Sequence, residues 1–395
     1  MIHIHPFPAR MAPEIALKGL EGLPKEYVVL DPMSGSGMVL GTAAKIGLKA
    51  VGYDLDPLAC LISRANGRSV CADKVLKSLD SLLKCCRDVD QKDIHLSWID
   101  SDQETQKYID FWFGPMQQRQ LRALSYFLVE KPFIKNERIL DILRISVSRL
   151  IITKEPKASF ARDTAHSRPH RTIRENLFDV FEAIPKSLSH VLTALKPDQI
   201  KSDVKSYRGD ARKMGRVADE SVDCIITSPP YLNAIDYMRG HKLSLVWMGY
   251  SVAELRNIRG RSVGAEIVLD GEYDKEFGAF LGNLHDDIDE KKRRILTRYY
   301  SDLCGLTRDA FRVLKENRDA TYVMGNSHVK GNEIRNSDLL ILAAEKAGFV
   351  VSDVKTRNIP ENRRYMPMMN SEKTALSNRM KLEYVIKFHK PVSST

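Results

Sequence analysis

The stretch YVVLDPMSGSG, residues 27–37, decides the fold that we predict for this chain. Its first part is a short apolar run that ends in an acid, which is typical of a buried strand, and the glycines after it allow a tight turn. A helical pattern over residues 38–46 and a strand pattern over residues 47–54 complete a β-α-β unit. The sequence therefore predicts an α/β fold, and the sheet pattern resumes near residue 203.

The same turn predicts a site for a nucleoside cofactor. Gly35 and Gly37 would let the backbone approach a ligand, and Asp54 follows the second strand, where a carboxylate can accept hydrogen bonds from a ribose. The turn lacks the third glycine of the dinucleotide fingerprint, unless Gly41 serves. That spacing disfavours NAD and favours a cofactor without a pyrophosphate, such as S-adenosyl-L-methionine.

A second motif, SPPY at residues 228–231, follows a buried-strand pattern over residues 222–227. Two prolines fix their own φ angles and lack N–H groups, so the carbonyls around them act as acceptors in a rigid loop. Such a pocket suits a substrate NH₂ group, and Tyr231 could stack on a base taken out of its helix. Ser228 has no Gly-x-Ser-x-Gly elbow or evident paired histidine, which argues against a hydrolase nucleophile.

Together the two motifs resemble those of the amino-directed DNA methyltransferases, which use S-adenosyl-L-methionine. The resemblance covers most of residues 1–66 and 203–390, and implies a Rossmann-like class I domain with a mostly parallel seven-stranded sheet in the order 3-2-1-4-5-7-6. It implies that the Ser228–Tyr231 loop holds the target amine. It also implies a cofactor site formed by Phe7, Arg10, Asp31, Pro32, Ser34, Gly35, Gly37, Asp54 and Asp210.

Serine as the first residue of SPPY resembles the subgroup that methylates the N4 amine of cytosine. Two features depart from the family's common pattern: the cofactor motif precedes the amine motif, and Met38 stands where threonine is frequent. N6-adenine methylation of DNA by the same architecture is the main alternative. Methylation of RNA and an inactive DNA-binding homologue are further alternatives. Cytosine C5 chemistry is disfavoured because the chain has no Pro-Cys pair.

Residues 66–200 have long helical periodicity, and we predict a helical insertion between two parts of a catalytic domain, residues 1–65 and 201–395. The insertion is a candidate target-recognition region. Its segment from residue 157 to 171 is polar, basic and irregular, which is typical either of a solvated loop or of one that contacts DNA. Substrate-binding candidates lie there and after the SPPY motif: Arg162, His166, Arg168, Asp236, Tyr237 and Arg239. The loops expected at residues 257–264 and 358–367 could also read bases.

Composition sets limits on the class of protein. The chain has 395 residues and a net charge of +10, and residues 118–174 carry thirteen Lys/Arg against five Asp/Glu, which favours a polyanionic partner. The six cysteines suggest neither disulfides nor a zinc site, and Pro169 between His166 and His170 argues against a metal pair there. We found no signal peptide and no membrane span, so we expect a cytoplasmic enzyme. A cognate restriction endonuclease is a candidate partner, and the sequence predicts no oligomeric state.

Overall fold

The computed structural model describes residues 3–7, 11–232, 236–265, 274–282, 289–329, 332–359 and 382–392. Its main sheet has seven strands, and the first five of them in sequence are mutually parallel where they pair. From one edge to the other the strands are β5 (Val204–Arg208), β2 (Lys49–Asp54), β1 (Val28–Asp31), β6 (Val222–Thr227), β7 (Leu314–Gly325), β11 (Leu382–Lys390) and β10 (Val350–Asn358). Counted within this sheet, the order is 3-2-1-4-5-7-6, as predicted.

The middle of the sheet contains a switch point in the strand order. β1 pairs in parallel with β2 on one side and with β6 on the other. The chain therefore leaves β1 in one direction and returns to its other side later, which opens a crevice beyond the carboxyl ends of these strands. β11 runs antiparallel to both β7 and β10. Both predicted motifs, at residues 31–37 and 228–231, follow strands that border this crevice.

Alternating side chains of the central strands pack on opposite faces. Val29 and Ile226 lie in a cluster with helices α1 (Pro13–Leu20) and α2 (Met38–Ile46). Leu30 and Ile225 lie in a second cluster with α13 (Glu290–Val313) and α14 (Asn336–Lys346), near α12 (Lys275–Gly282). Strands buried on both faces explain why these segments read as continuous apolar runs.

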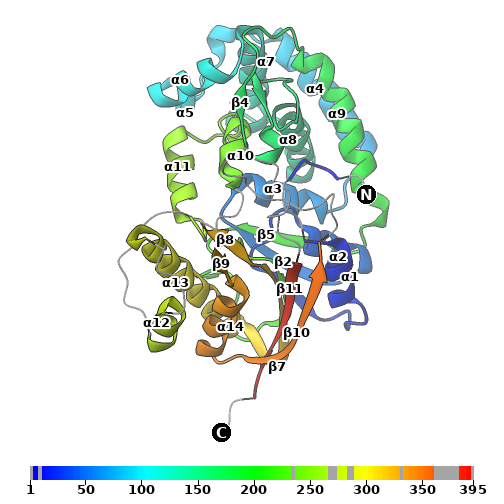
Figure 1. Ribbon diagram of the computed structural model, residues 1–395. Coiled ribbons are helices and arrows are strands. Elements are labelled where there is room, and N and C mark those ends of the chain that lie inside the picture. The colour runs from blue at the N-terminus through cyan, green and yellow to red at the C-terminus, as the bar shows by residue number, and fades with distance from the viewer. Residues whose placement is uncertain are drawn as a thin grey trace.

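A helical region covers the end of the sheet that holds the crevice (Figure 1). It comprises α4 (Ala72–Asp88), α5 (Ser97–Asp100), α6 (Gln103–Trp112), α7 (Pro115–Ser125) with a π-helical turn (Tyr126–Glu130), α8 (Glu137–Ile151) and α9 (Val180–Leu195). Short 3-10 turns lie at Gln91–Asp93, Thr164–His166 and Pro197–Gln199, and two-stranded pairs are β3 (Ala161–Arg162) with β4 (His170–Arg171) and β8 (Ser327–Val329) with β9 (Asn332–Ile334).

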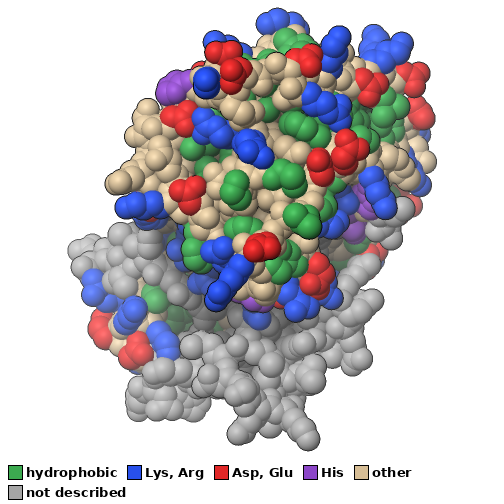
Figure 2. Space-filling view, turned by 90° about the horizontal axis from the view of Figure 1, so that it is seen from above, with side chains coloured by type: hydrophobic (Ala, Val, Ile, Leu, Met, Phe, Trp, Pro, Cys, Tyr) green, Lys and Arg blue, Asp and Glu red, His purple; other side chains and the backbone are tan. Residues whose placement is uncertain are grey.

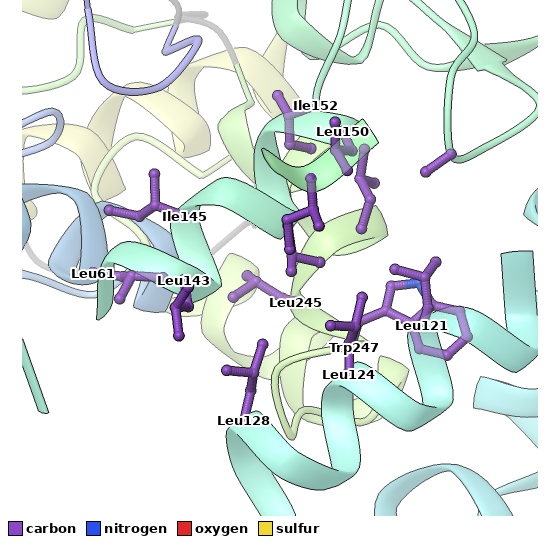
Figure 3. Packing of buried hydrophobic residues seen from close by; sticks show 14 of the residues in the cluster. Leu61, Leu121, Leu124, Leu128, Leu143, Ile145, Leu150, Ile152, Leu245 and Trp247 are labelled. Atoms are coloured by element: carbon purple, nitrogen blue, oxygen red, sulfur yellow. The ribbon is translucent and has the colours of Figure 1, made fainter. Parts of the chain in front are cut away.

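One apolar cluster joins this region to α3 (Pro57–Asn66), α10 (Tyr237–Leu245) and α11 (Val252–Arg261). Figure 3 shows Leu61 of α3, Leu143 of α8 and Trp247 after α10 within it. The prediction of a loop at residues 257–264 was wrong, because the helix α11 extends to Arg261. The division into residues 1–65 plus 201–395 and an insertion of residues 66–200 stays a prediction. Most of the 358–367 loop lies outside the described residues.

The outer face of the helical region carries both signs of charge. Figure 2, seen from above this region, shows Lys and Arg side chains interspersed with Asp and Glu. The excess of positive charge therefore forms no uniform patch on that face. In the part of the chain that the structure describes, no helix combines the length and apolar character needed to cross a membrane.

Candidate active site

The glycine turn after β1 is bonded to the end of β2. The backbone N–H of Gly35 donates to Asp54 Oδ2 at 2.8 Å, and both the N–H and the hydroxyl of Ser34 donate to the carbonyl of Tyr53, at 2.8 and 3.2 Å. Pro32 is buried in the same turn. Asp54 is thus held beside the turn, where both would border a ligand at the strand ends.

Gly37 has a left-handed conformation that ends the turn and begins α2. Its φ is +72°, and a Cβ added to it would lie 2.6 Å from the Cα of Ser63 in α3. Both the backbone conformation and the close approach of α3 therefore require glycine. Gly35 also has a positive φ, of +46°.

Two carboxylates lie at the ends of β1 and β2, of which Asp31 is buried and Asp54 is partly buried. Burial raises the pKa of Asp31 to about 7, against the hydrogen bonds from Thr227 and Met33. Burial and then the nearby charge of Asp56 raise the pKa of Asp54 to about 7 as well. A group that carries positive charge would stabilise the ionised forms of both side chains, so this pair suits a cationic ligand.

The SPPY loop meets the glycine turn directly. Thr227 Oγ1 donates to Asp31 Oδ1 at 2.8 Å, which joins the residue before Ser228 to the residue that begins the turn. Pro229 is buried, whereas Ser228, Pro230 and Tyr231 are partly exposed. Burial raises the pKa of the Tyr231 hydroxyl, and a hydrogen bond with Ser228 opposes that rise. The structure therefore brings all four predicted amine-binding residues to one place beside the predicted cofactor turn.

A tyrosine from α13 holds this loop from behind. Tyr299 is 1% exposed, and its hydroxyl donates to the carbonyl of Pro230 at 3.0 Å. Gly264 lies on the same side, where a Cβ would be 3.6 Å from the Tyr231 carbonyl oxygen and 3.7 Å from the Tyr299 ring. Sequence reasoning missed Tyr299, since one tyrosine within a long amphipathic helix carries no local signal of such a contact.

Phe7 covers the glycine turn. Its ring would lie 3.4 Å from a Cβ on Gly35, and it stacks on Tyr237 with centroids 5.1 Å apart. The segment that carries it is fixed to α8, because Arg149 donates to the Ile4 carbonyl at 3.1 Å and His5 bonds to Ser148 Oγ at 2.8 Å. Phe7 and Tyr237 were predicted as a cofactor residue and a pocket residue, and the structure places them in contact. Arg10 lies outside the described residues.

Asp210, which the resemblance assigns to the cofactor site, is bonded to Arg212. Its carboxylate accepts from Arg212 Nε at 2.9 Å and from Nη2 at 2.6 Å. Burial raises the pKa of Asp210, but the Arg212 hydrogen bonds outweigh burial and lower it. Arg212 also bonds to Asp302 and donates to the Arg261 carbonyl at 2.9 Å, so it links this position to α11 and α13.

The basic segment of residues 157–171 is attached to the first turns of α10. The Gly240 N–H donates to Ser167 Oγ at 3.1 Å, and Ser167 Oγ donates to the Asp236 carbonyl. A Cβ on Gly240 would lie 2.4 Å from the carbonyl oxygen of Thr164, so the segment approaches the helix closely. Two groups of predicted substrate residues, far apart in sequence, therefore lie on one surface near the SPPY loop.

The side chains on that surface are exposed and partly paired. Arg162 bonds to Glu155 at 3.1 Å, His166 lies 3.4 Å from Asp163, and Arg168 is exposed. Asp236 accepts from Arg239 at 3.1 Å and from Arg259 at 2.6 Å. Exposed ion pairs of this kind contribute little stability, so a phosphate could replace the acidic partners at little cost.

Comparisons with known proteins bear on this arrangement. No protein-family model matches the chain. The Type II methyltransferase M.BsoBI of Geobacillus stearothermophilus is 24% identical over 263 residues, which cover 60% of this chain and 50% of that protein. The Type II methyltransferase M.MvaI of Kocuria varians is 22% identical over 95% of this chain and 87% of its own length. The chain is a sequence relative of the Type II methyltransferases.

This relationship agrees with the resemblance read from the two motifs. The chain spans half the length of the Geobacillus methyltransferase, but most of the length of the Kocuria enzyme. A solved S-adenosylmethionine-dependent methyltransferase from Methanosarcina mazei aligns with 98% of this chain and 100% of its own, at 8% identity and a TM-score of 0.34. The strand order of the chain itself, rather than this likeness, defines the methyltransferase fold.

Proposed function

We propose that this protein is a DNA methyltransferase that transfers a methyl group from S-adenosyl-L-methionine to the N4 amine of cytosine in duplex DNA. The observation that carries the proposal is the hydrogen bond from Thr227 to Asp31, at 2.8 Å. It joins two motifs that are 196 positions apart, so a methyl donor on the glycine turn and an amine on the SPPY loop would be neighbours. The relationship to Type II methyltransferases supports the same chemistry.

The residues around the turn fit the proposed cofactor. The turn that holds Gly35 is bonded to Asp54, which would accept from ribose hydroxyls, and Asp31 at the start of the turn would face the methionine end with its ammonium group. Both carboxylates have a pKa of about 7, which a cationic ligand would lower. S-adenosyl-L-methionine, when bound, supplies an electrophilic methyl group on a positively charged sulfur.

The SPPY loop would activate the amine. The lone pair of an exocyclic amine is delocalised into the base, so acceptors that bind both N–H groups favour a pyramidal nitrogen and stabilise the positive charge that develops on it. Ser228 Oγ and the Pro229 carbonyl are these acceptors, and Pro230 stiffens the loop. Tyr231 stacks on the flipped base. The nitrogen then loses its extra proton readily, without a dedicated buried base.

The surface formed by residues 157–171 and α10 is the proposed DNA contact. Arg162, His166 and Arg239 would replace their acidic partners with phosphates or bases when duplex DNA binds, and the exposed Arg168 would contact the DNA as well. We further propose that the protein acts in the cytoplasm within a restriction-modification system, with a cognate endonuclease as a partner.

Mass spectrometry of nucleosides tests the reaction. Duplex DNA is incubated with the protein and S-adenosyl-L-methionine, digested, and searched for N4-methylcytosine and N6-methyladenine. We expect N4-methylcytosine, with loss of at least 100-fold in rate for Ser228→Ala, which removes one amine acceptor. Ser81→Ala, an exposed serine of α4, is the matched control and should leave the rate unchanged. N6-methyladenine would overturn the choice of base, and methylation of RNA alone would overturn the choice of polymer.

A further inference from the structure

His241 of α10 is buried beside the proposed cofactor site and has one unsatisfied nitrogen. The residue is 1% exposed, and its Nδ1 is bonded to the carboxylate of Asp56. Its Nε2 is buried and has no hydrogen-bond partner in the part of the chain that the structure describes. A buried polar atom without a partner destabilises the fold, and a hydrogen-bonding group of a bound ligand would supply that partner.

Asp56 fixes which hydrogen bond the free nitrogen can make. An ionised carboxylate only accepts, so Nδ1 of the imidazole carries the hydrogen and donates it to Asp56 Oδ2. The other oxygen, Oδ1, accepts from the Leu58 N–H at 2.8 Å, which caps α3 and holds the carboxylate in place. An imidazole with its one hydrogen on Nδ1 presents a lone pair at Nε2, which can accept a hydrogen bond from an N–H or O–H group of a ligand.

The His241 ring lies near Asp54, the proposed ribose-binding carboxylate. Asp56 holds both groups, because its backbone N–H donates to Asp54 Oδ1 at 2.9 Å while its side chain bonds to His241. The His241 ring also packs against Phe7, with centroids 5.3 Å apart, and Phe7 covers Gly35. His241 thus belongs to the wall that surrounds the turn and Asp54.

We infer that His241, oriented by Asp56, binds the cofactor by accepting a hydrogen bond from one ribose hydroxyl while Asp54 accepts from the other. This inference rests on the proposed function, since it takes the ligand to be a nucleoside sulfonium. Each Asp54 oxygen already accepts one backbone N–H, from Gly35 or Asp56, which leaves limited capacity for a diol. His241 Nε2 would supply a further acceptor for the ribose hydroxyls. His241 is a binding residue in this arrangement and takes no part in methyl transfer.

Calorimetric binding of S-adenosylhomocysteine to the whole protein tests the assignment. His241→Asn keeps a group at the δ position for Asp56 but has nothing at the ε position, whereas His241→Gln keeps a polar group at the ε position. We expect His241→Asn to weaken binding about ten-fold, as loss of one hydrogen bond predicts, and His241→Gln to recover most of that loss. Asp56→Asn retains a cap oxygen but offers Nδ1 an NH₂, which moves the ring hydrogen to Nε2, and it should weaken binding similarly.

The 2′-deoxy and 3′-deoxy analogues of S-adenosylhomocysteine identify the hydroxyl. One analogue should bind the wild-type protein about ten-fold more weakly than S-adenosylhomocysteine does. The same analogue should bind His241→Asn with no further loss of affinity, because the analogue and the substitution remove the same hydrogen bond. Additive losses for both analogues, or a His241→Asn variant that binds S-adenosylhomocysteine like the wild type, would overturn the inference. Failure of the wild-type protein to bind S-adenosylhomocysteine would instead overturn the proposed function. Unfolding temperatures measured without ligand verify that each variant is folded. If His241→Asn does not fold, the binding measurements with Asp56→Asn test the inference instead.

Discussion

Tyr299→Phe should slow methyl transfer without changing cofactor affinity. The substitution removes only the hydroxyl that donates to the Pro230 carbonyl at 3.0 Å, at a site that is 1% exposed. A hydrogen bond of this kind contributes about 0.5–1.5 kcal/mol, and a partly buried carbonyl left without its donor can bring the cost to about 1–3 kcal/mol. We expect a loss of about 1–2 kcal/mol in the free energy of unfolding, measured in urea.

The same loss should act on catalysis, because the SPPY loop must hold the amine acceptors in position. If the transition state loses about 1–2 kcal/mol of positioning, kcat falls roughly five- to thirty-fold. Transfer of a labelled methyl group to DNA, at saturating cofactor and DNA, measures kcat. The KM for S-adenosyl-L-methionine should stay at the wild-type value, since Tyr299 does not line the glycine turn.

Two other tyrosines provide matched controls. The hydroxyl of Tyr300 donates to Asp274 Oδ2 at 3.0 Å, remote from the loop, so Tyr300→Phe also removes one hydrogen bond. The buried hydroxyl of Tyr322 has no partner among the described residues, so Tyr322→Phe should not reduce stability. If Tyr299→Phe and Tyr300→Phe lose similar stability and both keep the wild-type kcat, the Tyr299 hydroxyl only stabilises the fold and our reasoning is refuted.

Three further substitutions test the site. Gly37→Ala should abolish cofactor binding or folding, because Gly37 has a φ of +72° and its added Cβ would lie 2.6 Å from α3. Gly215→Ala is the control and should be tolerated, because a Cβ there would have nothing within 4 Å. Calorimetry and unfolding temperatures compare the two variants. Ser167→Ala should weaken binding of duplex DNA several-fold, measured by fluorescence anisotropy, and leave the Kd of S-adenosylhomocysteine unchanged; a changed Kd would contradict the separate roles. The wild-type protein should lose stability as the pH rises and Asp31 ionises, and Asp31→Asn should not show this loss. The folded-state pKa of Asp31, about 7, exceeds the ordinary value of 3.8, so ionisation of this side chain makes the wild type less stable as the pH rises from about 4 to about 7. In urea unfolding, the stability of the variant relative to the wild type should therefore be greater at pH 8 than at pH 4. The same relative stability at both pH values would exclude this role for Asp31.

The central part of the fold followed from local patterns. Apolar runs at residues 27–31 and 222–227 predicted buried strands, and the glycines at 35 and 37 predicted the turn between the first strand and its helix. Each of these signals lies within a few residues, so spacing alone could reveal it. The order of the seven strands is not local, and it was available only because the two motifs resemble a known family.

The error at residues 257–264 had a local cause. Gly260 and the arginines around it suggested a loop, either solvated or in contact with nucleic acid, but Ser251 and Glu254 form a capping box that begins α11. Val252, Leu255 and Ile258 follow at helical spacing and are buried in the helical cluster. The capping signal was present in the sequence and should have outweighed a single glycine, whose cost in a helix is only about 1 kcal/mol.

Tyr299 and His241 could not be found in this way. Tyr299 contacts a residue 69 positions away, and His241 contacts one 185 positions away. Neither residue stands in a motif whose spacing has chemical meaning, and a single histidine or tyrosine in a helix is most often part of the core. Their roles depend on how α13 and α10 pack against the strand ends, which periodicity does not determine.

The helical region contributes to the proposed cofactor site as well as to the proposed DNA surface. Ser148 of α8 bonds to His5 at 2.8 Å and accepts from Ser244 of α10 at 2.7 Å, so one buried serine joins the segment that carries Phe7 to the helix that carries His241. One turn before Ser244 in the same helix, the Gly240 N–H donates to Ser167 Oγ of the basic segment at 3.1 Å. One helix therefore contacts both the segment next to the candidate cofactor site and the candidate DNA surface.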